Sequence, residues 1–433
     1  MKIGILGGGV AGVNVAKFLD KRNDITILEA DKSPGGLAAS YEFDGFYYDV
    51  GPHIIFSKNK EVLNYMLSID KDLIPHQRSN QIWYKGKFIK YPFENYLGLL
   101  DHEEKEECLN SFVNNPYTKY KPKNMYQFFL NKFGSGITDT YLGPYNEKIW
   151  KYNPSFLDLQ MVERIPSPPI QDVIDGANSK FKEGYTHQSC FYYPKKGGIQ
   201  TFFNKMVKSL EKNCKFLANK KITEIKKGNK KWEVYCDREK FEFDKIINCM
   251  PVHNFIPLLN TEKPSYVEKT LEKLKYNSMF CGVIIFSKDQ AGDNFSLNIP
   301  SNDIIFHRIS KLNFLGEDHP KNKSAFLYEI TYRDDMLISK FSKEQIMDLV
   351  IQGFEDMKLA KKEDFLNFDM LKIKMAYVIY DLHHRENTDK ILKYTNSIGI
   401  YSCGRFAEFE YVNMDHVIER AMKLCEKINK EKN

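Results

Sequence analysis

The sequence has 433 residues, enough for two or three domains around a large core. Its formal net charge is +6, and it contains no long basic run that would suggest a nucleic-acid partner. No run of about 18 apolar residues predicts a membrane span, and the first residues form a strand pattern instead of a signal peptide. None of the eight cysteines has CxxC spacing, so we expect no metal site and a cytoplasmic protein with reduced thiols.

The first elements in the chain are predicted to be a strand, a glycine-rich turn and a helix. The apolar run Ile3–Leu6 is followed by glycines at the GxGxxG positions, which are Gly7, Gly9 and Gly12. A helical pattern then runs from Val13 to Asp20. In dinucleotide-binding proteins these glycines permit the tight turn, the approach of the pyrophosphate to the backbone, and the packing of helix on strand. The helix N-terminus offers free N–H groups to phosphates.

A second strand and a second glycine loop follow. The strand Ile25–Leu28 ends at Glu29, where a carboxylate accepts hydrogen bonds from ribose hydroxyls. A lone GxGxxG motif is a weak signal and is also found in purely structural turns, but strand, glycines, helix, strand and acid together predict a dinucleotide site. The next loop, residues 30–38, contains Gly35 and Gly36. It resembles the loop beside the flavin in FAD-dependent oxidases of the amine oxidase class, so we expect FAD.

The middle of the chain mixes helical and antiparallel patterns. Residues 60–70 and roughly 98–180 are predicted to be mostly helical, and Lys85-Gly86 joins two short strands into a hairpin. Alternating strands are predicted at Met279–Phe286, at Ala325–Tyr332 and within 370–380. We interpret these strands as an antiparallel substrate sheet beside a helical lobe.

Three later segments are predicted to return to the first sheet. They are the short strands at 215–225, the buried strand around Asp244–Pro251, and Ile398–Arg405 followed by the helix Met414–Ile428. The predicted fold is therefore α/β, with a discontinuous Rossmann-like FAD-binding domain at 1–75, 190–270 and 395–433. The helical lobe is expected at 96–189, and the antiparallel sheet domain at 76–95 and 271–394.

Several further segments, in order across nearly the whole chain, resemble the UDP-galactopyranose mutase family. That family interconverts the pyranose and furanose rings of a sugar nucleotide. The matching segments are Asp49–Phe56, which resembles a glycine–histidine loop on the flavin face; Tyr145–Trp150; Arg164-Ile165-Pro166; His307-Arg308-Ile309; and Gly404-Arg405 followed by Tyr411–Asp415.

The resemblance implies a role for each matching residue. Arg164 and Arg308 would neutralise the substrate diphosphate by charge-assisted hydrogen bonds. The remaining catalytic and substrate-binding candidates are the hydroxyl donors Tyr185, Tyr377 and Tyr411, the loop residue His53, the base-packing Tyr145, the sugar-lining Trp150, and Glu94. The cofactor-binding candidates are Gly7, Gly9, Gly12, Glu29, Gly36, Ile222, Arg405 and Met414.

The implied reaction uses N5 of reduced FAD as the nucleophile and leaves the flavin in its starting oxidation state. It implies a nucleoside-diphosphate sugar as substrate, an electron donor such as NAD(P)H, and a role in cell-surface polysaccharide synthesis; a homodimer is compatible with it. Glu94 stands where the family has an asparagine near the sugar, which leaves the sugar open. The alternatives are an oxidase of the amine oxidase or protoporphyrinogen oxidase type and a non-catalytic flavin-binding scaffold. Each arginine or aromatic residue above also has an ordinary interpretation as a surface ion-pair partner or a core side chain.

Overall fold

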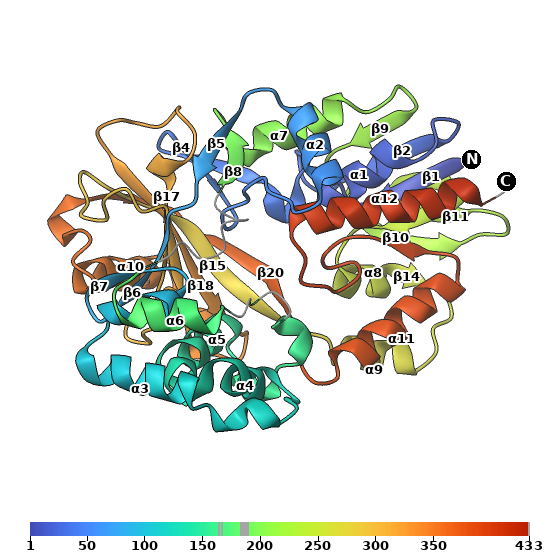
Figure 1. Cartoon of the computed structure of the whole chain (residues 1–433). Coiled ribbons are helices and arrows are strands. Elements are labelled where there is room, and N and C mark those ends of the chain that lie inside the picture. Colours follow the sequence, from blue (N-terminus) through green and yellow to red (C-terminus); the bar gives the residue numbers. More distant parts are fainter. Residues whose placement is uncertain (163–164, 166–167, 182–189, 432–433) are drawn as a thin grey trace.

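The computed structural model of the protein describes residues 1–162, 165, 168–181 and 190–431. One end of the molecule is built on a parallel sheet with the strand order β21-β13-β1-β2-β9 (Figure 1). Its strands are β1 (Lys2–Leu6), β2 (Asp24–Leu28), β9 (Cys214–Leu217), β13 (Lys245–Asn248) and β21 (Tyr401–Ser402). These strands come from three separated parts of the chain, so the predicted α/β class with a discontinuous Rossmann-like sheet is confirmed.

Helices from both ends of the chain pack on this parallel sheet through apolar side chains. Helix α1 (Val10–Phe18) packs against α12 (Met414–Lys430), so the two ends of the chain lie side by side (Figure 1). Ile3, Ile5 and Val15 are fully buried in the core between them. Complete burial of such an aliphatic side chain contributes about 1.5–3 kcal/mol. The further helices here are α2 (Lys60–Ile69), α7 (Gly198–Lys208), α8 (Val252–Leu258) and α9 (Tyr266–Leu271).

Smaller sheets connect this end to the rest of the molecule. One of them is a four-stranded sheet in the order β12-β11-β10-β14. The strands of these sheets are β10 (Ile222–Lys227), β11 (Trp232–Cys236), β12 (Glu239–Phe243), β14 (Leu259–Asn260), and the pairs β3 (Ser40–Phe43) with β4 (Phe46–Asp49) and β5 (Leu73–Gln77) with β8 (Cys190–Pro194).

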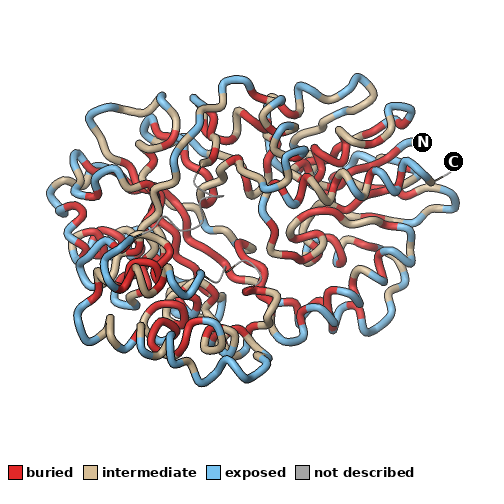
Figure 2. Tube along the Cα trace, viewed as in Figure 1, coloured by how far each residue is buried: buried red, intermediate tan, exposed pale blue. Residues whose placement is uncertain are grey.

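The other end of the molecule contains a mixed, largely antiparallel sheet in the order β19-β15-β18-β17-β16-β6-β7, with β20 also paired to β15. Its strands are β6 (Asn80–Tyr84), β7 (Lys87–Lys90), β15 (Lys275–Phe286), β16 (Ser296–Asn298), β17 (Arg308–Lys311), β18 (Ser324–Tyr332), β19 (Phe365–Phe368) and β20 (Leu371–Ile379). The predicted hairpin at Lys85-Gly86 and the three predicted strands are confirmed. Strands β15 and β18 are buried along almost their whole length (Figure 2).

A helical lobe packs beside this sheet, as the sequence predicts. It consists of η2 (Phe93–Leu99), α3 (His102–Val113), α4 (Met125–Ile137), the π-helix η4 (Thr138–Leu142), α5 (Gly143–Trp150) and α6 (Ile170–Ala177). Buried Lys148 fixes α5 to the sheet side, because its ammonium group donates to the Ile299 carbonyl at 3.0 Å and to the Ser301 carbonyl at 2.5 Å. Asn277 of β15 donates to the Trp150 carbonyl at 2.6 Å. The end of α5 is therefore held against the sheet.

Some elements were not predicted or differ in length. Helices α10 (Lys343–Asp356) and α11 (His384–Ser397) lie where we predicted neither a helix nor a strand. Helix α11 continues to Ser397 and Gly399 then turns the chain with a φ of 84°, so the strand predicted at Ile398–Arg405 is reduced to Tyr401–Ser402. Within the described parts of the chain, every helix is too short or too polar to cross a lipid bilayer.

Candidate functional site

A cavity of about 1110 Å³ extends from the glycine turns of the parallel sheet to the face of the antiparallel sheet. Its walls bring together segments that are far apart in the sequence. The predicted site residues among its lining are Gly7, Gly9, Glu29, Gly36, His53, Ile222, Arg308, Tyr377, Arg405, Tyr411 and Met414.

The two glycine loops meet at one end of the cavity. Gly9 forms a parallel bridge with Gly35, and the Gly35 N–H donates to the Gly8 carbonyl at 3.1 Å. A Cβ atom on Gly9 would lie 3.7 Å from the Gly35 carbonyl oxygen, in ordinary contact, whereas one on Gly12 would lie 1.9 Å from the Gly7 oxygen. Gly12 is therefore required for packing of α1 on the turn, while Gly9 keeps space open at the helix N-terminus.

That helix N-terminus has the properties of a phosphate site. Gly9 is the N-cap of α1 and provides no side-chain hydrogen bond, and the first turn contains no acidic residue. The backbone N–H groups of the first turn are therefore available to an anion, and the helix dipole favours negative charge there.

Glu29 lies beside the same turn, at the end of β2. Its Oε2 accepts the Gly8 N–H at 2.5 Å, and its Oε1 accepts the Asp31 N–H at 2.9 Å. Burial raises the pKa of this carboxyl, and the two backbone donors oppose that shift. The carboxyl is thus held at the cavity wall by the backbone around it.

The opposite end of the cavity is dominated by a buried ion pair. Arg308 of β17 donates through Nε to Glu329 Oε1 at 2.6 Å and through Nη2 to Oε2 at 2.7 Å. The Tyr377 hydroxyl donates to the same Oε2 at 3.1 Å. Glu329 has no exposed side-chain surface, whereas the Arg308 side chain remains 31% exposed. The carboxylate thus fixes an arginine whose outer side faces the cavity.

Aromatic rings surround this pair. The Trp150 ring contacts the rings of Tyr377 and Tyr411 edge-on, at centroid distances of 5.6 and 5.4 Å. The Arg405 guanidinium lies over the Tyr411 ring at 4.5 Å and donates to the Ala376 carbonyl at 2.8 Å. The cavity end therefore combines guanidinium groups with phenol hydroxyls on packed rings.

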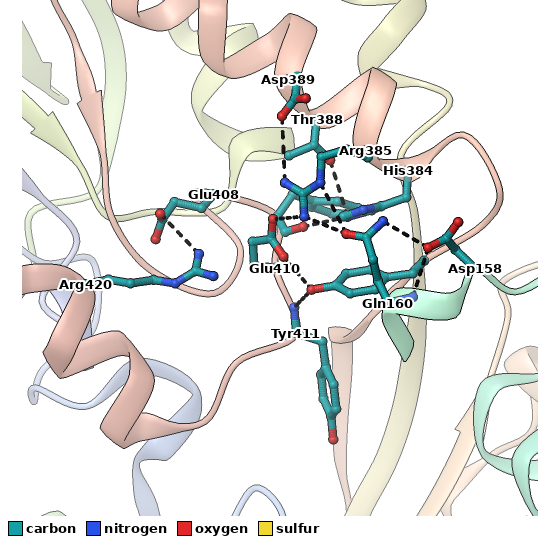
Figure 3. A network of polar contacts seen from close by, with 12 residues as sticks. Asp158, Gln160, His384, Arg385, Thr388, Asp389, Glu408, Glu410, Tyr411 and Arg420 are labelled. Carbon is teal, nitrogen blue, oxygen red and sulfur yellow. Dashed lines mark hydrogen bonds and ion pairs between the residues drawn. The ribbon is translucent and has the colours of Figure 1, made fainter. Parts of the chain in front are cut away.

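A polar network behind Tyr411 fixes its backbone. Figure 3 shows the Tyr411 ring pointing away from this network. The Tyr411 N–H donates to the Tyr380 hydroxyl at 2.7 Å, which in turn donates to Glu410 at 2.5 Å. Arg385 of α11 pairs with the other Glu410 oxygen at 2.6 Å. The network thus holds the main chain of Tyr411, while its ring packs against Trp150, Tyr377 and Arg405.

His53 lies in the loop after β4, which turns at Gly51 with a φ of 79°. Burial and the nearby charge of Arg405 lower the pKa of His53 to about 4, so its ring is neutral at pH 7. Among the described residues, none hydrogen-bonds to its Nδ1. Buried Asp49 accepts the His53 N–H at 3.3 Å and anchors this loop.

Several predicted site residues lie elsewhere. Tyr145 stacks on Tyr141 at 5.4 Å and lies near enough to Arg308 for that charge to lower its pKa, although burial raises the pKa more strongly. Glu94 is buried in η2, where its charge adds to the effect of burial in raising the pKa of Tyr91. Tyr145, Trp150, Glu94 and Gly12 are not among the residues that line the cavity. The predicted residues Arg164 and Tyr185 lie outside the described residues.

Sequence reasoning missed two residues here. Glu329 is a lone acid within the apolar strand Ala325–Tyr332, a placement that itself indicates a buried partner. Arg78, between β5 and β6, lines the cavity and belongs to no recognisable motif. Among the described residues, no cluster of histidine, cysteine or acidic side chains suits a metal ion.

The geometry defines a flavoprotein of the class that combines a parallel dinucleotide-binding sheet with an antiparallel substrate sheet. The sequence model of the family described as "Flavin containing amine oxidoreductase" matches residues 10–371. The chain belongs to this family, and it is an FAD-binding protein.

Solved structures show the same fold along the whole chain. The structure of reduced UDP-galactopyranose mutase superimposes with a TM-score of 0.90 and 22% identity, covering 99% of this chain and 93% of that one. A putative protoporphyrinogen oxidase from Exiguobacterium sp. 255-15 gives a TM-score of 0.78 at 16% identity, covering 100% and 99%. At these identities the similarity establishes the fold.

Curated relatives match a smaller part of the chain. An L-amino-acid oxidase from Crotalus adamanteus is 23% identical over 249 residues, which is 53% of this chain and 46% of the relative. The chain thus aligns with about half the length of the L-amino-acid oxidases it matches.

Proposed function

We propose that the protein is a flavin-dependent mutase that interconverts the pyranose and furanose forms of a nucleoside-diphosphate sugar. The observation that carries this proposal is the Arg308–Glu329 pair beside the Tyr377 hydroxyl, at the end of the cavity opposite the glycine loops. A guanidinium fixed in this way suits a phosphate group, which accepts forked hydrogen bonds. An uncharged amine substrate would not need it.

The residues at the other end suit FAD. The open N-terminus of α1, the space above Gly9 and the buried Glu29 would hold the pyrophosphate and a ribose, while Gly36, Ile222, Arg405 and Met414 line the rest of the cofactor path. When bound and reduced, the flavin supplies a nucleophilic ring nitrogen.

The chain's own side chains would handle the charge that develops when the sugar–phosphate bond breaks. Arg308 would stabilise the departing diphosphate without reorienting, because Glu329 already fixes it. Tyr377 and Tyr411 would add hydroxyl donors, and Trp150 would exclude water from the sugar. His53 would act as a neutral ring in the loop, since its pKa of about 4 leaves it uncharged at pH 7.

A second candidate is an FAD-dependent oxidase acting on an amine, an amino acid or a porphyrinogen. The family membership and the L-amino-acid oxidase relatives favour this candidate. The two functions differ in their use of oxygen, because an oxidase consumes one O₂ per turnover and a mutase consumes none.

The test compares dithionite-reduced, anaerobic protein with oxidised protein, using UDP-galactopyranose and other UDP-sugars. The mutase proposal expects furanose product by chromatography only from reduced protein, with no oxygen uptake. Oxygen uptake with L-amino acids or coproporphyrinogen, and no ring interconversion with any UDP-sugar, would establish the oxidase instead. Reduction by NADPH in place of dithionite then tests the proposed electron donor.

A further inference from the structure

The sheet end of the cavity contains Arg78, which, unlike Arg308, has no acidic partner among the described residues. Among the described residues, none forms a hydrogen bond or an ion pair with Arg78, and its Nε is buried without a partner. Burial lowers the pKa of the Arg78 guanidinium; the nearby Tyr91 hydroxyl opposes this shift, and the charge of Arg308 adds to it. A cation in this position is electrostatically unfavourable until an anion arrives.

The backbone around Arg78 is nevertheless firmly held. Gln77, the last residue of β5, pairs with Cys190 of β8. The carbonyl of Ser79 accepts the N–H groups of Phe295 at 3.0 Å and Ser296 at 3.1 Å. The backbone on both sides of Arg78 is therefore hydrogen-bonded to neighbouring strands, so the segment that holds the unpaired side chain is well ordered by its contacts.

We propose that Arg78 is a second anion-binding side chain of the cavity, which binds a phosphate of the substrate diphosphate and receives its counter-charge from the ligand. Arg308 and Arg78 would then have different roles in binding the diphosphate. Arg308 is oriented in advance by Glu329, whereas Arg78 supplies the uncompensated positive charge that attracts the ligand. The identity of the anion as a diphosphate rests on the proposed function, but anion binding by Arg78 does not.

The experiment uses FAD-loaded protein and measures the affinities for inorganic pyrophosphate and UDP by titration calorimetry. Arg78→Met should keep the flavin content of the parent and bind both probes roughly tenfold to a hundredfold more weakly, the loss expected for one charge-assisted hydrogen bond. Arg78→Lys keeps the positive charge but lacks the paired N–H donors of a guanidinium, so its affinity for both probes should lie between those of the parent and Arg78→Met. Arg333→Met is the matched control, because Arg333 is paired with Asp335 away from the cavity.

Thermal stability without ligand separates binding from a structural role. Removal of an unpaired charge should leave the melting temperature of Arg78→Met equal to that of the parent or above it, while pyrophosphate should raise the parent's value more than the variant's. A clear fall in stability or loss of FAD would assign Arg78 to the scaffold or the cofactor site and overturn the proposal.

The outcomes also separate this inference from the proposed function. Pyrophosphate affinity that depends on Arg78, in a protein without mutase turnover, would support Arg78 and remove the mutase assignment. If Arg78→Met kept mutase turnover with the parent's KM and UDP affinity, the mutase assignment would stand and the role of Arg78 would be refuted. A parent that binds neither probe would overturn both.

Discussion

Arg308 and Glu329 occupy directly facing positions of β17 and β18 and are joined by two hydrogen bonds of 2.6 and 2.7 Å. The carboxylate is fully buried, while the guanidinium reaches the cavity. The strand register therefore pairs a guanidinium that is accessible from the cavity with a carboxylate that is buried in the core.

The first prediction concerns this pair. Glu329→Gln keeps the side-chain shape but leaves Arg308 without its counter-ion, so we expect a loss of about 1–3 kcal/mol in the free energy of unfolding. Saturating UDP should restore more stability to this variant than to the parent, because the ligand then supplies the missing negative charge. Denaturant unfolding with and without UDP measures both effects.

A surface ion pair provides the control for that measurement. Arg22→Ala breaks the exposed pair with Asp20, in which the arginine side chain is 77% exposed. Such exposed pairs contribute little to stability, because water and salt screen them. If Glu329→Gln changed stability as little as Arg22→Ala, the Arg308–Glu329 pair would not have the organising role described above.

The second prediction separates two glycines of one motif. Gly9→Val should fold, because a Cβ there meets only ordinary contacts, but it should lose FAD as the branched side chain fills the phosphate space. Gly12→Val should fail to fold, because its Cβ would lie 1.9 Å from the Gly7 oxygen. Flavin absorbance and circular dichroism of the two purified variants provide the comparison. Full flavin occupancy in Gly9→Val would contradict the assignment of the phosphate site.

Local patterns were enough to predict the elements that carry the cofactor. The apolar run at Ile3–Leu6, the glycines after it and Glu29 form a continuous unit, because a strand, a tight turn and a helix have short-range sequence signals. The long strands β15 and β18 were also predicted, since they are apolar over almost their whole length.

Long-range pairing was not predictable in the same way. The pairing of Arg308 with Glu329 depends on the register of β17 against β18, which no local pattern specifies. No sequence pattern marks Arg78. What distinguishes it is a buried Nε without a hydrogen-bond partner among the described residues, and this is visible only in the folded structure. Arg308 was identified because its segment resembles a known family. Glu329 and Arg78 could be identified as site residues only from the folded structure.

The third prediction concerns sugar preference and Glu94. An ionised carboxylate only accepts hydrogen bonds, whereas an amide also donates. The family resemblance places this position near the sugar, although Glu94 is buried in η2 outside the cavity lining. We therefore expect Glu94→Asn to change the relative affinity for UDP-galactose and UDP-N-acetylgalactosamine, which carry a hydroxyl and an acetamido group at the same sugar carbon. Competition binding of the two sugar nucleotides against UDP measures the ratio, with unchanged UDP affinity as the internal control. An unchanged ratio would place Glu94 among the residues that merely support the lobe.

The last prediction uses the contact between Asp49 and His53 and their opposite titration. Burial raises the pKa of Asp49 to about 7, although Ser40, Tyr193 and the His53 N–H donate to its carboxyl. Burial lowers the pKa of His53 to about 4. Between pH 4 and 6.5 the native Asp49 binds more protons than the unfolded one, so its contribution to stability falls as pH rises. In the same window the unfolded His53 binds more protons than the native one, so its contribution rises with pH. In the parent the two slopes oppose each other.

Relative to the parent, Asp49→Asn should therefore gain stability with rising pH, and His53→Gln should lose it, each by on the order of 2–3 kcal/mol across the window. Urea unfolding at pH 4.5, 5.5 and 6.5 measures the two differences, and slopes of the same sign in both variants would refute the opposed titration of this loop and its anchor.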